Sequence, residues 1–111
     1  MLQVIWHYNV KEGKYNDFKN WILEIQDKWS QIQSPGWKYL GTYCTVLNMG
    51  ILDWQDRYEI ENMAAFDTLR EYENEEYTKI MKEFYSFVDY NYYTKIEVIR
   101  DVATIKILEG T

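Results

Sequence analysis

The spacing of apolar residues alternates between a strand period and a helix period along this chain, and that order constrains its fold more than any other feature. Residues 2–10 divide into two alternating sets of side chains. One set is Val4, Trp6, Tyr8 and Val10, and the other is Gln3, Ile5, His7 and Asn9. A period of two with one apolar face predicts a β-strand.

A helix is predicted after Gly13. Apolar residues then recur three and four positions apart, at Tyr15, Phe18, Ile22, Ile25, Trp29 and Ile32. This spacing gives one continuous apolar stripe along a helix. Ser34, Pro35 and Gly36 should end it, because the residue before a proline disfavours the helical conformation and glycine lets the chain turn.

The rest of the chain repeats this order. Residues 37–46 and 52–60 have strand character and flank Asn48, Met49 and Gly50, a turn signal that predicts an antiparallel hairpin. Residues 63–88 have a helical pattern, with Asn62 as N-cap and a break near Asn74. Its apolar positions are Phe66, Leu69, Tyr77, Ile80, Met81, Phe84 and Val88. Residues 93–100 predict a strand, and residues 102–108 a short fifth one.

The predicted fold class is therefore α+β, with the ferredoxin-like order βαββαβ. It has a four-stranded antiparallel sheet with two helical layers on one face. The whole chain, residues 1–111, is predicted to be one domain, since its length is that of one ordinary domain.

The hairpin register predicts which side chains share a face of the sheet. If the turn is centred on Met49, four pairs follow: Thr42 with Asp56, Gly41 with Arg57, Leu40 with Tyr58, and Tyr39 with Glu59. The even-numbered strand residues are mostly apolar and should face the helices. The odd-numbered face mixes aromatic and polar side chains, among them His7, Trp37, Tyr39, Tyr43, Arg57 and Glu59. Such a face suits contact with a second copy, so we expect a homodimer.

Composition limits the partners. The formal net charge of -6 disfavours nucleic acid and anionic membranes, and neither is predicted as a partner. Cys44, as the single cysteine, forms no internal disulfide, and neither a signal peptide nor a membrane-spanning run is evident, so we expect a cytoplasmic protein. Eleven tyrosines and five tryptophans indicate either an extensive interface or a ligand cavity.

Two stretches resemble the NIPSNAP-like group of the dimeric α/β-barrel superfamily. They are YNVKEGKYNDF, residues 8–18, and residues 36–67, from GWKYLGTY through NMGILDWQDRYEIENMAAFD. The resemblance implies two ferredoxin-like subunits packed sheet to sheet into a barrel, and it implies an architecture more than an activity. The chain departs from the group at Glu12, where a proline is usual, and at Trp6, where an arginine is common.

Relatives in the wider superfamily include haem-degrading monooxygenases and polyketide cyclases, which place a histidine on the second helical region. This chain has its one histidine at position 7, in the first strand. We therefore predict no cofactor and no metal site. No zinc quartet, phosphate loop or calcium loop occurs in the sequence.

Two residues are candidates for acid–base chemistry, Asp56 and His7. Asp56 falls on the helix-facing side, where a carboxylate must pair, accept hydrogen bonds or shift its pKa. A structural Asp56 would pair with Lys38 or accept a bond from Thr42 or Tyr8. A functional Asp56 would be the acid–base group of a pocket between sheet and helices. His7 is either a general base or, as we favour, a structural residue bonded to Glu59, Asn9 or a tyrosine of the second copy.

The candidate ligand-binding residues are Trp6, Tyr8, Trp54, Tyr58 and Arg57. Arg57 and Glu59 also suit an ion-pair network at the dimer interface, the simpler interpretation. Cys44 should face the helices and be buried and inert.

Three functions remain open. The leading hypothesis is a homodimeric NIPSNAP-like barrel of unassigned role that binds a small apolar or aromatic molecule. The alternatives are a cofactor-independent monooxygenase, isomerase or cyclase that uses Asp56 or His7, and a purely structural interaction module.

Overall fold

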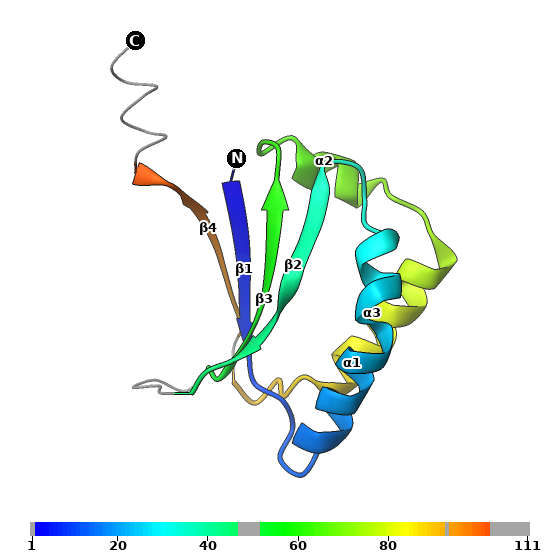
Figure 1. Cartoon of the computed structure of the whole chain (residues 1–111), viewed down its shortest axis with the longest axis vertical. Helices are drawn as coiled ribbons and strands as arrows, with labels where there is room; N and C mark the ends of the chain where they lie inside the picture. The colour runs from blue at the N-terminus through cyan, green and yellow to red at the C-terminus, as the bar shows by residue number, and fades with distance from the viewer. Residues whose placement is uncertain (1, 47–51, 93, 103–111) are drawn as a thin grey trace.

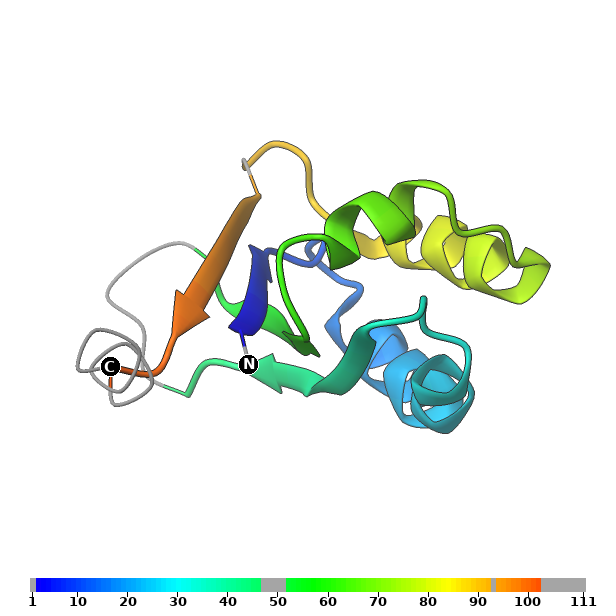
Figure 2. The same cartoon turned by 90° about the horizontal axis from the view of Figure 1, so that it is seen from above.

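Helices and strands follow one another in the predicted order in the computed structural model, which describes residues 2–46, 52–92 and 94–102. The elements are β1 (Leu2–Tyr8), α1 (Tyr15–Gln31), β2 (Trp37–Cys44), β3 (Trp54–Ile60), α2 (Ala65–Arg70), α3 (Glu75–Phe87) and β4 (Lys95–Arg100). The four strands form one antiparallel sheet in the order β2-β3-β1-β4. All three helices lie on the same side of it (Figures 1 and 2). The α+β ferredoxin-like prediction is confirmed.

The second helical region is divided where the sequence predicted a break. Asn74 is the N-cap of α3, and its side-chain oxygen accepts a hydrogen bond of 3.0 Å from the backbone N–H of Tyr77. The prediction for Asn62 is wrong in position, because Ala64 precedes the first residue of α2. Asn62 instead accepts a bond from the Ala64 N–H and closes the turn before that helix.

The register between β2 and β3 agrees with the prediction in one half of the hairpin only. Thr42 lies opposite Asp56 and Gly41 opposite Arg57, as expected. Tyr39, however, lies opposite Tyr58, because Leu40 is an extra residue in β2 and forms a β-bulge. The predicted pairs of Leu40 with Tyr58 and of Tyr39 with Glu59 are therefore wrong.

The bulge moves two aromatic residues from the outer face of the sheet to the helix-facing side. Trp37 lies opposite Ile60, its indole N–H donates to the carbonyl of Ala65 at 2.8 Å, and its ring packs edge-on against Phe66. Tyr39 meets the ring of Tyr58 at a centroid distance of 5.5 Å. The sequence had placed both on the face that should meet a second copy. That part of the prediction is wrong.

Glycine at position 41 permits this bulge. Gly41 has a φ of 151°, which side-chain-bearing residues rarely adopt. The ring of Tyr43 also lies close above it, since a Cβ atom at Gly41 would be 3.1 Å from the Tyr43 hydroxyl oxygen.

The core between sheet and helices consists of two clusters of buried residues. The larger contains Tyr8, Val10, Phe18, Phe84 and Val88, and the smaller contains Val4, Ile60 and Ala65. Val10 and Val88 form an isolated bridge, flanked by backbone bonds from Lys11 to Phe87 and from Asp89 to Asn9, each 2.8 Å long. These bonds tie the end of β1 to the end of α3.

Some predictions lie outside the described residues: the turn at 48–50 and, from residue 103 on, the fifth strand. Within the described ranges, none of the helices is long and apolar enough to cross a membrane.

Candidate functional site

A carboxylate lies buried in the middle of the sheet, on the side that faces the helices. Asp56 of β3 is 4% exposed. Its Oδ1 atom accepts two hydrogen bonds, one of 2.7 Å from the Tyr8 hydroxyl on β1 and one of 2.8 Å from the Thr42 hydroxyl on β2. Of the partners considered from the sequence, the two hydroxyls are present. Lys38 lies opposite Glu59 and is exposed, so it does not pair with Asp56.

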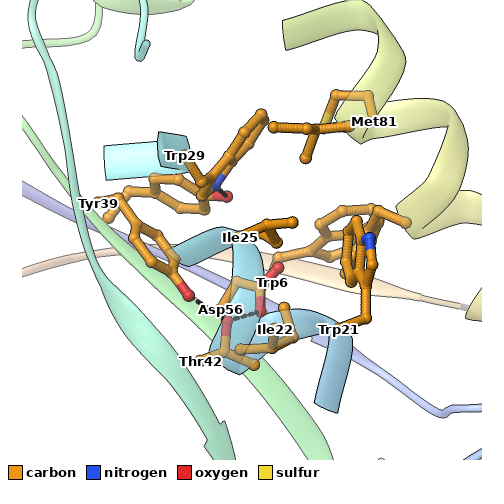
Figure 3. A pocket seen from close by; sticks show the side chains of 12 residues that line it. Trp6, Trp21, Ile22, Ile25, Trp29, Tyr39, Thr42, Asp56 and Met81 are labelled. Atoms are coloured by element: carbon orange, nitrogen blue, oxygen red, sulfur yellow. Dashed lines mark hydrogen bonds between the residues drawn. The ribbon is translucent and has the colours of Figure 1, made fainter. Parts of the chain in front are cut away.

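The bulge adds a second tyrosine to this network. The hydroxyls of Tyr39 and Thr42 are hydrogen-bonded to each other. Because the single hydroxyl proton of Thr42 is donated to Asp56, Tyr39 is the donor to Thr42. A chain of hydroxyl groups thus runs from Tyr39 through Thr42 to Asp56 (Figure 3).

Burial dominates the acid–base properties of this network. It raises the pKa of Asp56 from 3.8 to about 7, although the bonds from Tyr8 and Thr42 favour the anion and act to lower it. The pKa of Tyr8 is raised far above its usual value, first by burial and then by the neighbouring Asp56. Burial also raises the pKa of Tyr39 to about 12. Asp56 therefore exchanges its proton near neutrality, while the tyrosines keep theirs.

A small cavity adjoins this carboxylate, and we call it the Asp56 cavity. Its volume is about 10 Å³, roughly the space of one water molecule. The sheet contributes Trp6, Tyr39, Thr42, Asp56 and Tyr58 to its wall, and the helices contribute Trp21, Ile22, Ile25, Trp29, Ile80, Met81 and Phe84 (Figure 3). The carboxylate is thus the one acidic group in a mostly apolar enclosure.

A larger apolar groove lies beside this cavity. It has a volume of about 280 Å³ and lies between the sheet and helices α2 and α3. Its walls are Val4, Trp6, Trp37, Tyr58, Phe66, Leu69, Tyr77, Met81, Tyr85 and Ile96. Trp6, Tyr58 and Met81 line both spaces, so the groove and the Asp56 cavity are separated only by shared side chains.

The candidate site residues predicted from the sequence lie in three places: the wall shared by the two spaces, the core, and the outer face of the sheet. Trp6 and Tyr58 line both spaces. Tyr8 is fully buried beneath the carboxylate, and Trp54 packs edge-on against Phe18 in the core, 5.0 Å between ring centroids, away from both spaces.

His7 and Arg57 lie on the outer face of the sheet. His7 Nε2 is 2.6 Å from Glu97 Oε1, a partner that the sequence did not suggest. Arg57 donates from Nε to Gln55 Oε1 at 2.8 Å, and its guanidinium lies 5.2 Å from the centre of the Tyr43 ring. In the described part of the chain no carboxylate forms an ion pair with Arg57. The structure therefore does not bring His7 and Asp56 into one site.

Cys44 corrects another prediction. It lies opposite Trp54, on the helix-facing side as predicted. It is nevertheless exposed, because it is the last residue of the edge strand β2. Partial desolvation and the nearby carboxylate of Asp53 raise the pKa of its thiol. Among the described residues, no cluster of three His, Cys, Asp or Glu side chains could hold a metal ion.

Neither a family model nor a curated protein matches the sequence. Solved structures do match. A NIPSNAP domain protein from Burkholderia xenovorans superposes with a TM-score of 0.69 at 11% identity, over 93% of this chain and 96% of that one.

A putative antibiotic biosynthesis monooxygenase from Nitrosomonas europaea gives a TM-score of 0.63 at 12% identity, over 92% and 99% of the two chains. A further structure described as an antibiotic biosynthesis monooxygenase gives 0.59 at 17% identity, over the same shares. These similarities confirm the fold expected from the resemblance to NIPSNAP-like proteins.

Proposed function

We propose that this protein binds a small apolar or aromatic molecule in the apolar groove, with Asp56 at the inner end of the site. The observation that carries the proposal is the groove itself. Its volume of about 280 Å³ is close to the lower end of ligand sites, roughly 300 Å³. Its ten wall residues are all aliphatic, aromatic or thioether side chains. Binding there would remove these side chains from water, which favours an apolar ligand.

A second candidate function is proton transfer by Asp56, the acid–base role considered from the sequence. A general base works best when its pKa is close to the working pH, and burial raises the pKa of Asp56 to about 7. Both bonds to Asp56 use Oδ1, and no other described residue donates to Oδ2. Oδ2 is therefore the oxygen available to a ligand.

The corresponding step is isomerisation. Oδ2 takes a proton from a C–H bond, the electron pair of that bond stays on the ligand, and the protonated Asp56 returns the proton to a different ligand atom. No atom is gained or lost. Asp56 is the support for this function, because a shared fold with proteins described as monooxygenases does not by itself assign an activity.

We also propose that the protein is a homodimer that packs through the outer face of the sheet. The helices cover one face only (Figure 1). The outer face keeps Tyr43 and Ile99 exposed, with 46% and 42% of their surfaces accessible. Their burial against a second copy would stabilise the pair.

Ligand binding can be tested with N-phenyl-1-naphthylamine, a neutral apolar fluorophore. We expect saturable binding to the wild type with one molecule per chain. Leu69→Trp fills the groove and should weaken binding at least about 10-fold, as expected for a lost apolar site. Leu23→Trp is the control, because Leu23 is exposed on α1. Absence of saturable binding, or equal weakening by both variants, would contradict the proposal.

Proton transfer needs a separate test. Native mass spectrometry of protein purified without added ligand reports any retained small molecule. If that molecule is then incubated with the protein in D₂O, we expect deuterium uptake with the wild type and none with Asp56→Asn. Asp27→Asn, at an exposed position of α1, should behave as the wild type. Equal uptake with Asp56→Asn would exclude Asp56 as the base.

A further inference from the structure

We infer that the ligand of the apolar groove carries a neutral carbonyl oxygen, which accepts hydrogen bonds from the indole N–H of Trp6 and the hydroxyl of Tyr58. The inference rests on the proposed binding function and names the class of ligand. It follows from two unused hydrogen-bond donors on residues that line both the groove and the Asp56 cavity.

The first unused donor is the N–H of Trp6. Its Nε1 atom is buried and has no hydrogen-bond partner in the described residues. Three other tryptophans do have one: Trp21 donates to Glu83, Trp29 to Tyr58 and Trp37 to the carbonyl of Ala65. An unpaired buried donor is rare, because it loses its bonds to water without replacement.

The second unused donor is the hydroxyl proton of Tyr58. The oxygen of Tyr58 accepts a bond of 3.1 Å from Trp29, but within the described ranges the hydroxyl donates to no acceptor. The neighbouring tyrosines differ in this respect, since Tyr8 donates to Asp56 and Tyr39 donates to Thr42. Tyr58 is held in position by Trp29 with its proton still to be shared.

Both donors belong to the wall between the Asp56 cavity and the groove. Trp6 and Tyr58 line both spaces, and the third shared residue, Met81, has no donor. Trp6 also lies directly opposite Asp56 in the sheet. A ligand that fills the groove and extends toward Asp56 must therefore pass between these two residues.

The chemistry of the wall favours a neutral acceptor over an anion. Of the described residues that line the two spaces, none is Lys, Arg or His, and one is an aspartate. A carboxylate or phosphate would be buried there without a counter-charge. A carbonyl oxygen has two lone pairs and can accept both bonds.

The test uses 1-tetralone and tetralin, which share a bicyclic frame and differ at the carbonyl. Calorimetric titration of the full chain gives the ratio of the two dissociation constants, in which the apolar contribution largely cancels. We expect Tyr58→Phe and Trp6→Phe each to reduce the preference for the ketone by about 3- to 10-fold, as the loss of one hydrogen bond would. Trp54→Phe is the matched control, because Trp54 packs against Phe18 in the core and lines neither space, so its replacement should leave the ratio unchanged.

Infrared spectroscopy supplies a second measurement that does not depend on affinity. The carbonyl stretch of bound 1-tetralone should lie at lower frequency in the wild type than in Tyr58→Phe. If the ratio and the stretch are unchanged in both donor variants, a water accepts from these donors and the inference is overturned. It is also overturned if N-phenyl-1-naphthylamine binds but 1-tetralone does not. If the fluorophore also fails to bind, the proposed function itself fails.

Discussion

The hydroxyl of Tyr8 donates a 2.7 Å hydrogen bond to Oδ1 of Asp56, and both residues are buried between the sheet and the helices. This bond and the one from Thr42 favour the charged carboxylate, while removal from water favours the neutral acid. Burial has the larger effect, so the folded protein holds the Asp56 proton more tightly than an unfolded chain does. Stability should therefore depend on pH through this residue.

The first prediction is the direction of that dependence. The pKa of Asp56 is about 7 in the folded state against 3.8 for an ordinary aspartate. Between these values the folded state binds more protons than the unfolded one, so the contribution of Asp56 to stability falls as pH rises from about 4 to about 7. The fall should be on the order of 4 kcal/mol, at 1.36 kcal/mol for each pH unit. Urea unfolding at pH 5 and at pH 8 covers about two of these units and should show a fall of roughly 3 kcal/mol.

Asp56→Asn is the comparison that isolates this residue from the other carboxylates. The amide oxygen of asparagine can still accept from Tyr8 and Thr42, but it has no charge to bury. At pH 8 we expect the variant to be more stable than the wild type, and at pH 5 the two should be equal or the variant weaker. A variant that is less stable by the same amount at both pH values would show that the carboxylate is purely structural.

The second prediction concerns the donor. Tyr8→Phe keeps the buried ring and removes the hydroxyl, so Asp56 loses one of its two hydrogen bonds. We expect a loss of about 1–3 kcal/mol in the free energy of unfolding. The pKa of Asp56 should rise further, because the Tyr8 bond lowers it. Carboxyl chemical shifts followed by NMR against pH report the second effect.

Tyr90→Phe is the control for this variant, since Tyr90 is 60% exposed. It should change neither the stability nor the titration of Asp56. If Tyr8→Phe also leaves both unchanged, the bond between Tyr8 and Asp56 contributes nothing in solution.

The alternation of apolar residues predicted the helix-facing side of β1 and β3, and with it the burial of Tyr8 and Asp56. The prediction failed in β2, because either register of the residues before Gly41 places apolar side chains on the helix-facing side. Leu40 could face the helices in the predicted register, and Trp37 and Tyr39 do so in the observed one. One signal was available, since a glycine inside a strand often marks a bulge.

The groove and the exposure of Cys44 depend on packing that strand periodicity does not report. An even or odd position in a strand gives the face on which a residue lies, but it does not show how far the helices extend over that face. Cys44 therefore lies on the predicted face and is still exposed. The groove arises because α2, α3 and the sheet are not in full contact, and Ile96 of β4 remains 62% exposed on the helix-facing side.

The third prediction tests the bulge. Gly41→Ala places a Cβ atom on a backbone with φ of 151° and 3.1 Å from the Tyr43 hydroxyl oxygen. We expect a loss of about 1–3 kcal/mol in unfolding free energy, as for other strained backbone positions. Lys38→Ala, at an exposed position of the same strand, should stay within about 0.5 kcal/mol of the wild type. Chemical denaturation of the two variants decides, and equal stabilities would mean that the bulge does not require glycine.

The last prediction concerns assembly, and the corrected register determines which tyrosine can test it. Tyr39 is unsuitable, because it faces the helices and a charge there would disturb the core around Asp56. Tyr43 is suitable, because it lies exposed on the outer face with the Arg57 guanidinium 5.2 Å from its ring. In Tyr43→Glu the new carboxylate has that guanidinium as a neighbour, so each subunit should stay folded.

Two such carboxylates facing each other across a dimer would repel, and we expect dimerisation to weaken at least about 10-fold. Sedimentation velocity at micromolar concentration should show a wild-type dimer and a mostly monomeric variant, while Tyr15→Glu, at the exposed first residue of α1, remains dimeric. A folded wild-type monomer at that concentration would contradict the sheet-to-sheet dimer outright.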